Sequence, residues 1–487
     1  MYIRNEDTIC APATVPGTGA ISVIRVTGPE ALTIADKVIR CRKGSISESK
    51  GYTIKFGVIL DDAETVLDEV LVSIFRAPHS YTGENSVEIS CHASSYIVSA
   101  VMNLLYAAGV RAAEPGEFTQ RAFLNGKMDL AQAEAVADVI ASQNAAAHRI
   151  AFKQMKGGFS SELKGMRAEL LELVSLMELE LDFSEEEVEF ADRSRLNSLL
   201  GQLINHVGRL IDSFRLGNAI KNGVPVAIAG ATNTGKSTLL NALLGEDRAI
   251  VSDVHGTTRD TVEETLNIDG VLFRFIDTAG LRETEEIVEK IGIERTFKKI
   301  GEASIILGMV DLTRDFDSTC KTINEIVEKV DFDSQKLVFL LNKIDICEVN
   351  KNVSTINYIV SLLDSKGIKS SLSENASELT DVTPIIAISA KTGAGISILR
   401  SVLAASQRDL LADSDTTLVT NQRHVQALSD ARTSLLRVQE GLAIGLPTDL
   451  AAQDIREAIY HLGSIVGEIS TAEVLGNIFR NFCIGNN

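Results

Sequence analysis

The spacing of apolar and polar residues divides the chain into regions with different secondary structure. In residues 21–26 and 70–75, apolar and polar positions follow the pattern that is typical of strands with one buried face. Residues 29–41 and 95–108 carry the period that indicates helices. We therefore expect a compact α+β domain over residues 1–118.

Two later blocks of the sequence are almost entirely helical. In residues 130–140 the larger apolar side chains fall on one helical face, and a second helix is predicted over residues 162–181. The same pattern returns over residues 421–482. Neither block is an obvious free-standing core. We therefore expect residues 119–221 and 406–487 to pack together as one discontinuous helical domain, with the segment between them inserted.

Between the helical blocks, residues 224–241 predict a strand, a glycine-rich turn and the start of an amphipathic helix. The turn, residues 230–237, has the sequence GATNTGKS and matches G-x-x-x-x-G-K-[ST]. In this motif successive backbone N–H groups and the helix N-terminus face the phosphates of a nucleotide. Lys236 would reach the β- and γ-phosphates, and the hydroxyl of Ser237 would bind Mg²⁺. The alternative is a glycine-rich turn that binds nothing.

Three further motifs follow in the order that a guanine-nucleotide domain requires. A predicted strand ends at DTAG, residues 277–280, where Asp277 would support the metal and the N–H of Gly280 would approach the γ-phosphate. The next motif is NKID, residues 342–345. The carboxylate of Asp345 can accept hydrogen bonds from N1–H and N2–H₂ of guanine. Adenine offers no such pair of donors, so this motif predicts GTP rather than ATP.

The third motif is SAK, residues 389–391, whose backbone would meet the guanine O6. Four motifs at the ends of predicted strands weigh against a turn that binds nothing. They predict an inserted Ras-like P-loop GTPase domain over residues 222–405. The residues predicted to contact GTP are Asn233, Thr234, Gly235, Lys236, Ser237, Thr238, Thr258, Asp277, Thr278, Ala279, Gly280, Asn342, Lys343, Asp345, Ser389, Ala390 and Lys391.

The predicted hydrolytic site differs from that of Ras-like switches. There a glutamine that orients water follows D-x-x-G, whereas Leu281 holds that position here. Glu289 is a candidate for orienting the water, and an ordinary acid at the start of a helix is the alternative. Asn233 could hold a monovalent cation against the phosphates, where an arginine finger would otherwise stabilise charge. Thr258 is expected to complete the Mg²⁺ shell with Ser237.

Composition limits the class of protein. The 487 residues are enough for about three domains, and 45% hydrophobic with 23% charged residues indicate a soluble globular protein. No apolar run approaches the length of a membrane span, about 18 residues. The start of the sequence has neither a signal-peptide pattern nor a basic presequence, so we expect a cytoplasmic protein.

Charge and cysteine content exclude further classes. Six scattered cysteines without C-x-x-C predict neither a disulfide framework nor a zinc site. With 47 basic and 66 acidic residues, the net charge of −19 is wrong for a chain that coats nucleic acid with a broad basic face. Any contact with RNA must therefore be local or shared with a partner.

Five blocks along the chain are distinctive enough to compare with known families. They are PGEFTQRAFLNGKMDLAQAEA at residues 115–135, FCIG at 482–485, GTTRD at 256–260, GIER at 292–295, and the opening residues 7–17. These blocks resemble the bacterial family of tRNA modification GTPases called MnmE or TrmE, and the resemblance extends over nearly the whole chain. Other GTPases share the phosphate loop, but only this family combines it with the first block and the FCIG tail.

The resemblance implies a domain arrangement and a set of partners. It implies a tetrahydrofolate-binding N-terminal domain that forms a homodimer, a helical domain and an inserted GTPase domain. It also implies work with MnmG (GidA), a flavin- and NADH-dependent protein, in a heterotetramer or larger complex. Together they would place an aminomethyl or carboxymethylaminomethyl group on C5 of the wobble uridine of certain tRNAs. The implied cofactors are Mg²⁺, K⁺ and 5-formyl- or methylene-tetrahydrofolate.

The resemblance also implies roles for individual residues. The implied potassium ligands are Asn233, Ser252, Val254 and Thr257. Of these, Ser252 and Thr257 would also border GTP. The implied magnesium ligands are Ser237 and Thr258, and the implied catalytic glutamate is Glu289. The implied folate contacts are Arg25, Glu88 and Lys127.

The sequence departs from the family pattern at two places. Thr232 stands where the family usually has proline, which would loosen the hold on Asn233. Asn486 stands where the family usually ends in lysine after Cys-Ile-Gly, so a contact of that lysine with folate would be missing or replaced. Cys483 in the tail is a candidate nucleophile, and a buried free thiol is the alternative.

The leading interpretation is a potassium-stimulated GTPase that modifies tRNA together with a flavoprotein. A GTP-dependent ribosome-assembly factor or RNA-binding switch is the main alternative. It would need a basic RNA-binding module, and neither the composition nor residues 119–220 supply one. A third interpretation is an independent folate-dependent transferase in the N-terminal domain, which lacks an obvious nucleophile or base of its own.

Overall fold

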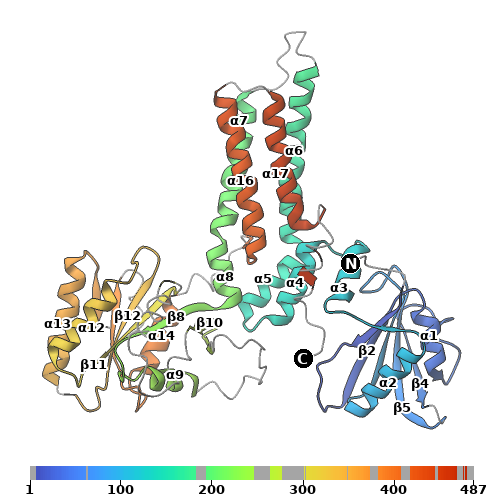
Figure 1. Ribbon diagram of the computed structural model, residues 1–487, viewed down its shortest axis with the longest axis horizontal. Helices are drawn as coiled ribbons and strands as arrows, with labels where there is room; N and C mark the ends of the chain where they lie inside the picture. Colours follow the sequence, from blue (N-terminus) through green and yellow to red (C-terminus); the bar gives the residue numbers. More distant parts are fainter. Residues whose placement is uncertain are drawn as a thin grey trace. The chain divides into compact units, whose positions relative to one another are not determined.

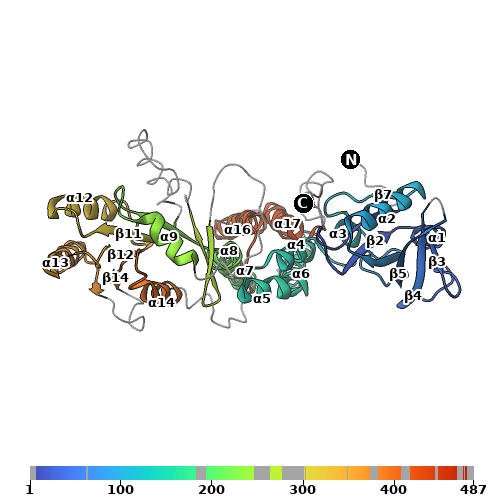
Figure 2. The same cartoon turned by 90° about the horizontal axis from the view of Figure 1, so that it is seen from below.

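The structure is a computed structural model of the chain, and it contains two compact units. Unit 1 comprises residues 1–141, 151–211 and 423–487, and unit 2 comprises residues 142–150 and 212–422. Each unit is thus built from separate segments of the sequence, whose elements Figures 1 and 2 show from two directions. The residues that the structure describes are 7–61, 64–182, 193–245, 264–276, 301, 303–347, 349–372, 382–406, 417–444, 448–468, 475 and 478–479.

The N-terminal part of unit 1 is a seven-stranded sheet with two helices on one face. Its strands lie in the order β3-β4-β5-β6-β2-β1-β7, and all neighbours are antiparallel except β1 and β7. They are β1 (Ile9–Pro12), β2 (Ile21–Thr27), β3 (Ile39–Cys41), β4 (Thr53–Leu60), β5 (Val66–Phe75), β6 (Ser86–His92) and β7 (Arg111–Ala112). Alternate residues of these strands form one core with α1 (Ala31–Val38) and α2 (Ser95–Ala107). The opposite face carries the more exposed positions, as period-two strands require.

One of the predicted helices is shorter than expected. The helical pattern of residues 29–41 predicted a helix that continues to residue 41, but α1 ends at Val38 and residues 39–41 form β3. Ile39 has an extended backbone and pairs with Ile59 on β4. The sheet therefore satisfies backbone groups that the last helical turn would otherwise have bonded.

The rest of unit 1 is helical and draws on both helical blocks of the sequence. Its helices are α3 (Glu117–Leu124), α4 (Leu130–Ala141), α6 (Gly158–Asp182), α7 (Arg193–Asp212), α16 (Gln422–Ala443) and α17 (Thr448–Val466), together with the end of α5 (Ala145–Met155). Figure 1 shows α6, α7, α16 and α17 side by side. His206 on α7 lies 2.5 Å from Glu162 on α6, and α17 packs along α6. No helix in the described ranges is long and apolar enough to cross a membrane.

A buried ionic cluster fastens the two helical blocks to each other. Glu134 on α4 accepts hydrogen bonds from Arg423 at 3.0 Å and lies 2.6 Å from His424, both at the start of α16. Arg423 also donates to the carbonyl oxygens of Ser464 and Ile465, in the last turn of α17. One guanidinium thus satisfies a buried carboxylate and the end of a helix at the same time.

Unit 2 is a seven-stranded sheet with helices on both faces. The strand order is β13-β14-β12-β11-β8-β10-β9, and only the pair β9 and β10 is antiparallel. The strands are β8 (Val224–Ala229), β9 (Glu264–Ile268), β10 (Val271–Phe275), β11 (Ile305–Asp311), β12 (Lys336–Asn342), β13 (Ser370–Leu372) and β14 (Thr383–Ala387). The helices are α8 (Phe214–Asn222), α9 (Lys236–Gly245), α12 (Phe316–Val327), α13 (Val349–Ser365) and α14 (Ile396–Ser406).

The central strands of unit 2 are buried on both faces, which explains their continuous apolar runs. Val226 and Ile228 face a core with α9 and α14, whereas Ala227 and Ala229 face a core with α12 and α13. The first core also contains α8 and the beginning of α5. Unit 2 is therefore a three-layer α/β structure whose core includes a piece of the upstream helical block.

The buried cluster around Glu134 predicts how the stability of unit 1 depends on pH. Burial alone would raise the pKa of Glu134, but His424 and Arg423 outweigh it and lower the pKa to about 2. The unfolded value is about 4.3, so this stabilisation is fully present above that pH and is lost as the pH falls toward 2. We expect Glu134→Gln to lower the free energy of unfolding by roughly 3 kcal/mol at pH 7.

Urea unfolding, with hydrogen exchange of α4 and α16 as a local readout, would measure this difference at several pH values. Glu172→Gln, at an exposed position of α6, is the matched control and should leave stability nearly unchanged. A difference between wild type and Glu134→Gln that stays constant from pH 7 to pH 3 would contradict the assignment.

Candidate functional site

The phosphate loop of unit 2 connects β8 to α9, and its glycines stand where a side chain would not fit. A Cβ on Gly230 would lie 2.4 Å from the carbonyl oxygen of Met309, and one on Gly235 would lie 2.5 Å from Nδ2 of Asn342. Asn233 has a positive φ of 61°. The loop thus curls tightly at the carboxyl end of β8, and α9 begins at Lys236.

Lys236 folds over the loop that precedes it. Its Nζ donates to the carbonyl oxygens of Gly230 at 2.9 Å and Ala231 at 2.8 Å. An ammonium group has three donors, so one remains for a phosphate. Burial lowers the pKa of Lys236, and the charge of Arg314 lowers it further. A polyanion at this site would relieve both effects, because it stabilises the charged form of the amine.

Asn342, at the end of β12, joins the phosphate loop to a second loop. Its Nδ2 donates to the carbonyl oxygen of Thr234 at 2.7 Å, and its Oδ1 accepts from the backbone N–H of Ala390 at 2.9 Å. The Asn342 side chain is almost completely buried. Both halves of one amide are therefore used, and the GATNTGKS, NKID and SAK motifs meet at one edge of the sheet.

The remaining base-reading residues lie around this contact. Asp345 and Lys391 are exposed, whereas Ser389 is buried and its hydroxyl accepts from the N–H of Thr392. Lys343 has a φ of 71° and donates to Asp311 at 2.6 Å. The Asp345 carboxylate is thus accessible to a base, while the residues beside it are fixed by the fold.

Sequence reasoning missed three residues at the end of β11. Asp311 accepts from Lys343 and from both the N–H and the hydroxyl of Thr313. Burial would raise the pKa of Asp311, but the hydrogen bonds from Lys343 and Thr313 outweigh it and lower the pKa. Arg314 donates to the carbonyl oxygen of Thr232 in the phosphate loop. The available signal was an acid, Asp311, directly after the apolar run at residues 305–310.

The described members of the predicted GTP set all lie at this edge of the sheet. They are Asn233, Thr234, Gly235, Lys236, Ser237, Thr238, Asn342, Lys343, Asp345, Ser389, Ala390 and Lys391. The hydroxyl-bearing residues Ser237 and Thr238 are exposed in the first turn of α9. The other predicted residues lie outside the described part of the chain, and these are Ser252, Val254, Thr257, Thr258, Asp277, Thr278, Ala279, Gly280, Glu289 and Cys483.

The predicted folate residues lie in unit 1, and two of them contact each other. Arg25 on β2 and Glu88 on β6 are cross-strand neighbours, with Arg25 donating to Oε1 of Glu88 at 2.8 and 3.0 Å. The Arg25 guanidinium lies 5.1 Å from the ring centre of Tyr81 and 5.6 Å from that of Phe118. Each side chain of the ion pair is about a quarter exposed, at 26% and 28%. The pair is therefore open on one side to a polar ligand.

Lys127, the third predicted folate residue, packs on the loop that carries Tyr81. Its Nζ donates to the carbonyl oxygen of Pro78 at 3.0 Å, and its side chain borders Gly83. The hydroxyl of Tyr81 lies 2.9 Å from that of Thr119 on α3. The loop of residues 78–85 thus lies between Lys127 and the pair of Arg25 with Glu88.

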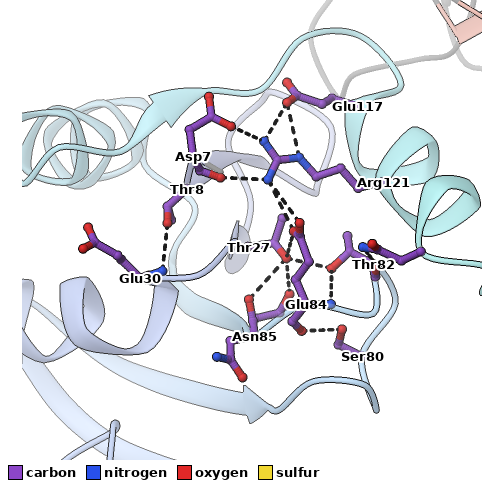
Figure 3. Close-up of polar contacts among 12 residues, drawn as sticks. Asp7, Thr8, Thr27, Glu30, Ser80, Thr82, Glu84, Asn85, Glu117 and Arg121 are labelled. Atoms are coloured by element: carbon purple, nitrogen blue, oxygen red, sulfur yellow. Dashed lines mark hydrogen bonds and ion pairs between the residues drawn. The ribbon is translucent and has the colours of Figure 1, made fainter. Parts of the chain in front are cut away.

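A buried polar network holds that loop in place, and Figure 3 shows it. Arg121 on α3 is fully buried and donates to Asp7, Glu84 and Glu117. Its contacts with Asp7 and Glu117 are 2.6 and 2.9 Å long. Glu84 in turn accepts from Thr27 at 3.2 Å. One cation thereby links the start of the chain, the loop and α3, and residues of the 115–135 block hold the loop that contacts Arg25 and Lys127.

The mostly parallel sheet with its phosphate, NKID and SAK loops at one edge defines a P-loop protein of the guanine-nucleotide-binding class. Two sequence-family models match the chain: the MnmE helical domain over residues 130–483, and the GTP-binding protein TrmE N-terminus over residues 8–127. The chain belongs to the tRNA modification GTPase MnmE family.

Relatives of this family are similar over nearly their whole length. The tRNA modification GTPase MnmE of Parabacteroides distasonis is 50% identical over 98% of this chain and 99% of its own. That of Bacteroides thetaiotaomicron is 51% identical over 99% and 100%, and that of Flavobacterium johnsoniae is 48% identical over 99% and 99%. The resemblance seen in the sequence is confirmed, and the chain is an enzyme, a GTPase of tRNA modification.

The position of Asn342 predicts a large effect on nucleotide binding. Asn342→Ala leaves the carbonyl of Thr234 and the N–H of Ala390 without their partner, which costs about 1–3 kcal/mol for each buried group. We expect the affinity for GDP and GTP to fall by roughly ten- to a hundredfold, as measured by calorimetric titration. Asn342→Asp keeps the acceptor for Ala390 but places a carboxylate against the Thr234 carbonyl. Its affinity for GDP and GTP should therefore be no higher than that of Asn342→Ala.

Asn324→Ala serves as the control, because Asn324 bonds the hydroxyl of Tyr358 between α12 and α13, away from the three loops. It should leave GDP affinity unchanged. Binding of GDP to Asn342→Ala at wild-type strength would show that the amide does not hold the two loops together for the nucleotide.

Proposed function

We propose that this chain is a potassium-dependent GTPase that acts on tRNA in the cytoplasm as a homodimer. With an MnmG (GidA) flavoprotein, it adds a carboxymethylaminomethyl or aminomethyl group to C5 of the wobble uridine in certain tRNAs. A tetrahydrofolate, in its 5-formyl or methylene form, is the proposed one-carbon cofactor of the N-terminal domain. The proposed domains are residues 1–118, 119–221 with 406–487, and 222–405.

The observation that carries this proposal is the junction made by Asn342. It joins a phosphate loop to the NKID and SAK loops in a chain whose relatives, at about 50% identity, are tRNA modification GTPases. The exposed carboxylate of Asp345 can accept the two guanine donors. The remaining donor of Lys236 and the N–H groups of the loop can bind the phosphates. Asp345 would discriminate against adenine nucleotides, because adenine offers no such pair of donors.

Two of the proposed metal ligands, Ser237 and Asn233, lie among the described residues, and their positions support the proposed roles. The hydroxyl of Ser237 is exposed in the first turn of α9, directly after Lys236, where a magnesium ion between β- and γ-phosphates would bind. Asn233 is exposed at the tip of the phosphate loop with a positive φ, and its neutral amide oxygen suits a monovalent cation. These ions would neutralise phosphate charge during hydrolysis. Ser252, Val254, Thr257 and Thr258 complete the proposed ion sites.

The proposed folate site rests on the open face of the N-terminal sheet. Glu88 can accept from the pterin N–H groups of the folate, and the adjacent Arg25 guanidinium can donate to the oxygen of the same ring. Tyr81 and Phe118 flank Arg25 with aromatic surface for a flat ring. Lys127 adds a second cation beside the same loop.

Potassium should accelerate GTP hydrolysis by this chain. We expect turnover to fall at least tenfold when sodium replaces potassium at equal ionic strength, because the smaller ion fits the same ligands poorly. Asn233→Ala should lose most of the difference between the two salts while retaining GTP binding. Measurement of phosphate release at saturating GTP tests both expectations. Equal rates of the wild-type protein in the two salts would remove Asn233 from its proposed role.

Loss of Glu289 should separate nucleotide binding from the modification of tRNA. Because this carboxylate is proposed to act only in the transition state, Glu289→Ala should bind GTP normally and lose at least a hundredfold in turnover. A strain that carries only this variant should lack the wobble-uridine group when its tRNA nucleosides are analysed by mass. Glu325→Ala, at an exposed position of α12, is the control and should retain both activities. Normal nucleosides in a strain that lacks the protein altogether would overturn the proposed function.

A further inference from the structure

Cationic side chains hold three successive carbonyl groups of the phosphate loop. Lys236 binds those of Gly230 and Ala231, and Arg314 binds that of Thr232. Carbonyl groups that are held on one side of the loop leave the following N–H groups to face the phosphates. Lys236 belongs to the phosphate-loop motif itself, but Arg314 lies 82 positions beyond Thr232 in the chain.

Arg314 is itself fixed by the loop that carries it. That loop runs from the end of β11 to α12, whose first turn is capped by Asp315 accepting from the N–H of Ser318 at 2.8 Å. Thr313 is held by Asp311 through bonds of 2.9 and 2.7 Å. The short segment between the buried end of β11 and a capped helix leaves little freedom for Arg314.

Asp311 connects Arg314 to the base-reading side of the site. Its Oδ2 accepts from Lys343 of the NKID motif at 2.6 Å and lies 3.9 Å from Nε of Arg314. The Asp311 side chain is 4% exposed, whereas that of Arg314 is 32% exposed. A polar chain therefore runs from Thr232 through Arg314 and Asp311 to Lys343, parallel to the direct bridge of Asn342.

The carbonyl that Arg314 binds lies next to the residue of the loop that has a positive φ. Thr232 directly precedes Asn233, which has the left-handed backbone that few residues other than glycine and asparagine adopt. Thr232 and Asn233 are both exposed, so the packing of a core does not fix them. The bond from Arg314 is a contact that can hold this peptide in that conformation.

We propose that Arg314 is a positioning residue of the GTPase site, which acts through the carbonyl of Thr232 to keep the phosphate loop in its nucleotide-binding conformation. Asp311 is its anchor and couples this hold to Lys343. The role does not depend on the potassium or folate assignments, because it concerns the phosphate groups that every guanine nucleotide carries. It assigns a function to residues that lie outside the four nucleotide motifs.

The test compares the affinities of the full chain for GMP, GDP and GTP, measured by competition with a fluorescent GDP analogue. Arg314→Ala should lower the affinities for GDP and GTP about tenfold, which corresponds to the loss of about one net hydrogen bond to a charged group. GMP, which lacks the phosphates that the loop cradles, should change less than about twofold. Arg314→Lys should recover to within about threefold of wild type, because an ammonium group still donates to one carbonyl.

Two further variants separate positioning from general damage. Arg215→Ala removes an arginine that donates to the carbonyl of Ser334 in the same unit, and it should leave all three affinities unchanged. Asp311→Asn should lower the affinity for GMP as well as for GDP, because Asp311 also binds Lys343 of the base-reading NKID motif. If Arg314→Ala fails to fold by circular dichroism, Arg314→Met keeps the aliphatic stem without a donor and replaces it in the test.

Two outcomes would overturn the proposal. Arg314→Ala could match Arg215→Ala in all three affinities, which would show that the bond to Thr232 has no effect on the nucleotide. Alternatively, its turnover could fall a hundredfold while the affinity for GDP stays normal, which would place Arg314 in direct contact with the reacting phosphate. An effect on KM and GDP affinity that exceeds the effect on kcat supports positioning.

Discussion

The nucleotide site of unit 2 depends on one side-chain amide. Asn342 donates to the carbonyl of Thr234 and accepts from the N–H of Ala390, so it requires a donor and an acceptor on the same rigid plane. The strands that carry these loops are not all neighbours, because β11 lies between β8 and β12. The sheet alone therefore fixes the loops only through an intermediate strand. The amide sets their separation directly, and its burial makes an unpaired alternative costly.

Next to the N-terminal sheet, a buried charged side chain, Arg121, joins separate segments of the chain as Asn342 does in unit 2. Arg121 is fully buried and gathers carboxylates from the start of the chain and from α3, together with Glu84 of the loop at 78–85. Burial alone would raise the pKa of Glu117, yet the hydrogen bonds from Arg111, the N–H of Glu114 and Arg121 outweigh it and lower the pKa. In both places an apolar core supplies the scaffold, and a fully satisfied polar centre fixes the exposed residues beside it.

The sequence allowed prediction of those parts of the site whose geometry is local. The phosphate loop was predictable because a strand, a turn and a helix follow one another within residues 224–241, and each glycine answers a nearby steric limit. Arg314 and Arg121 could not be placed, because Thr232 lies 82 positions from Arg314 and Asp7 lies 114 positions from Arg121, and only the complete fold brings these pairs together. The prediction that the helix of residues 29–41 continues to residue 41 was wrong for a related reason. Residues 39–41 pair with β4, and this pairing outweighs their local helical preference.

The beginning of α5 has a consequence for the independence of the nucleotide unit. Ala146 and Ala147 belong to the same buried cluster as Val226 and Leu240, although they precede the phosphate loop by more than seventy positions. Asn144 caps this segment and donates to the carbonyl of Ile220 on α8. Part of the surface of the GTPase domain is therefore apolar and is covered by the beginning of α5. Another GTPase domain inserted at this position would have to offer the same apolar surface to Ala146 and Ala147 of α5. Substitutions in the inserted domain and in the helical segment that precedes it are therefore constrained by each other.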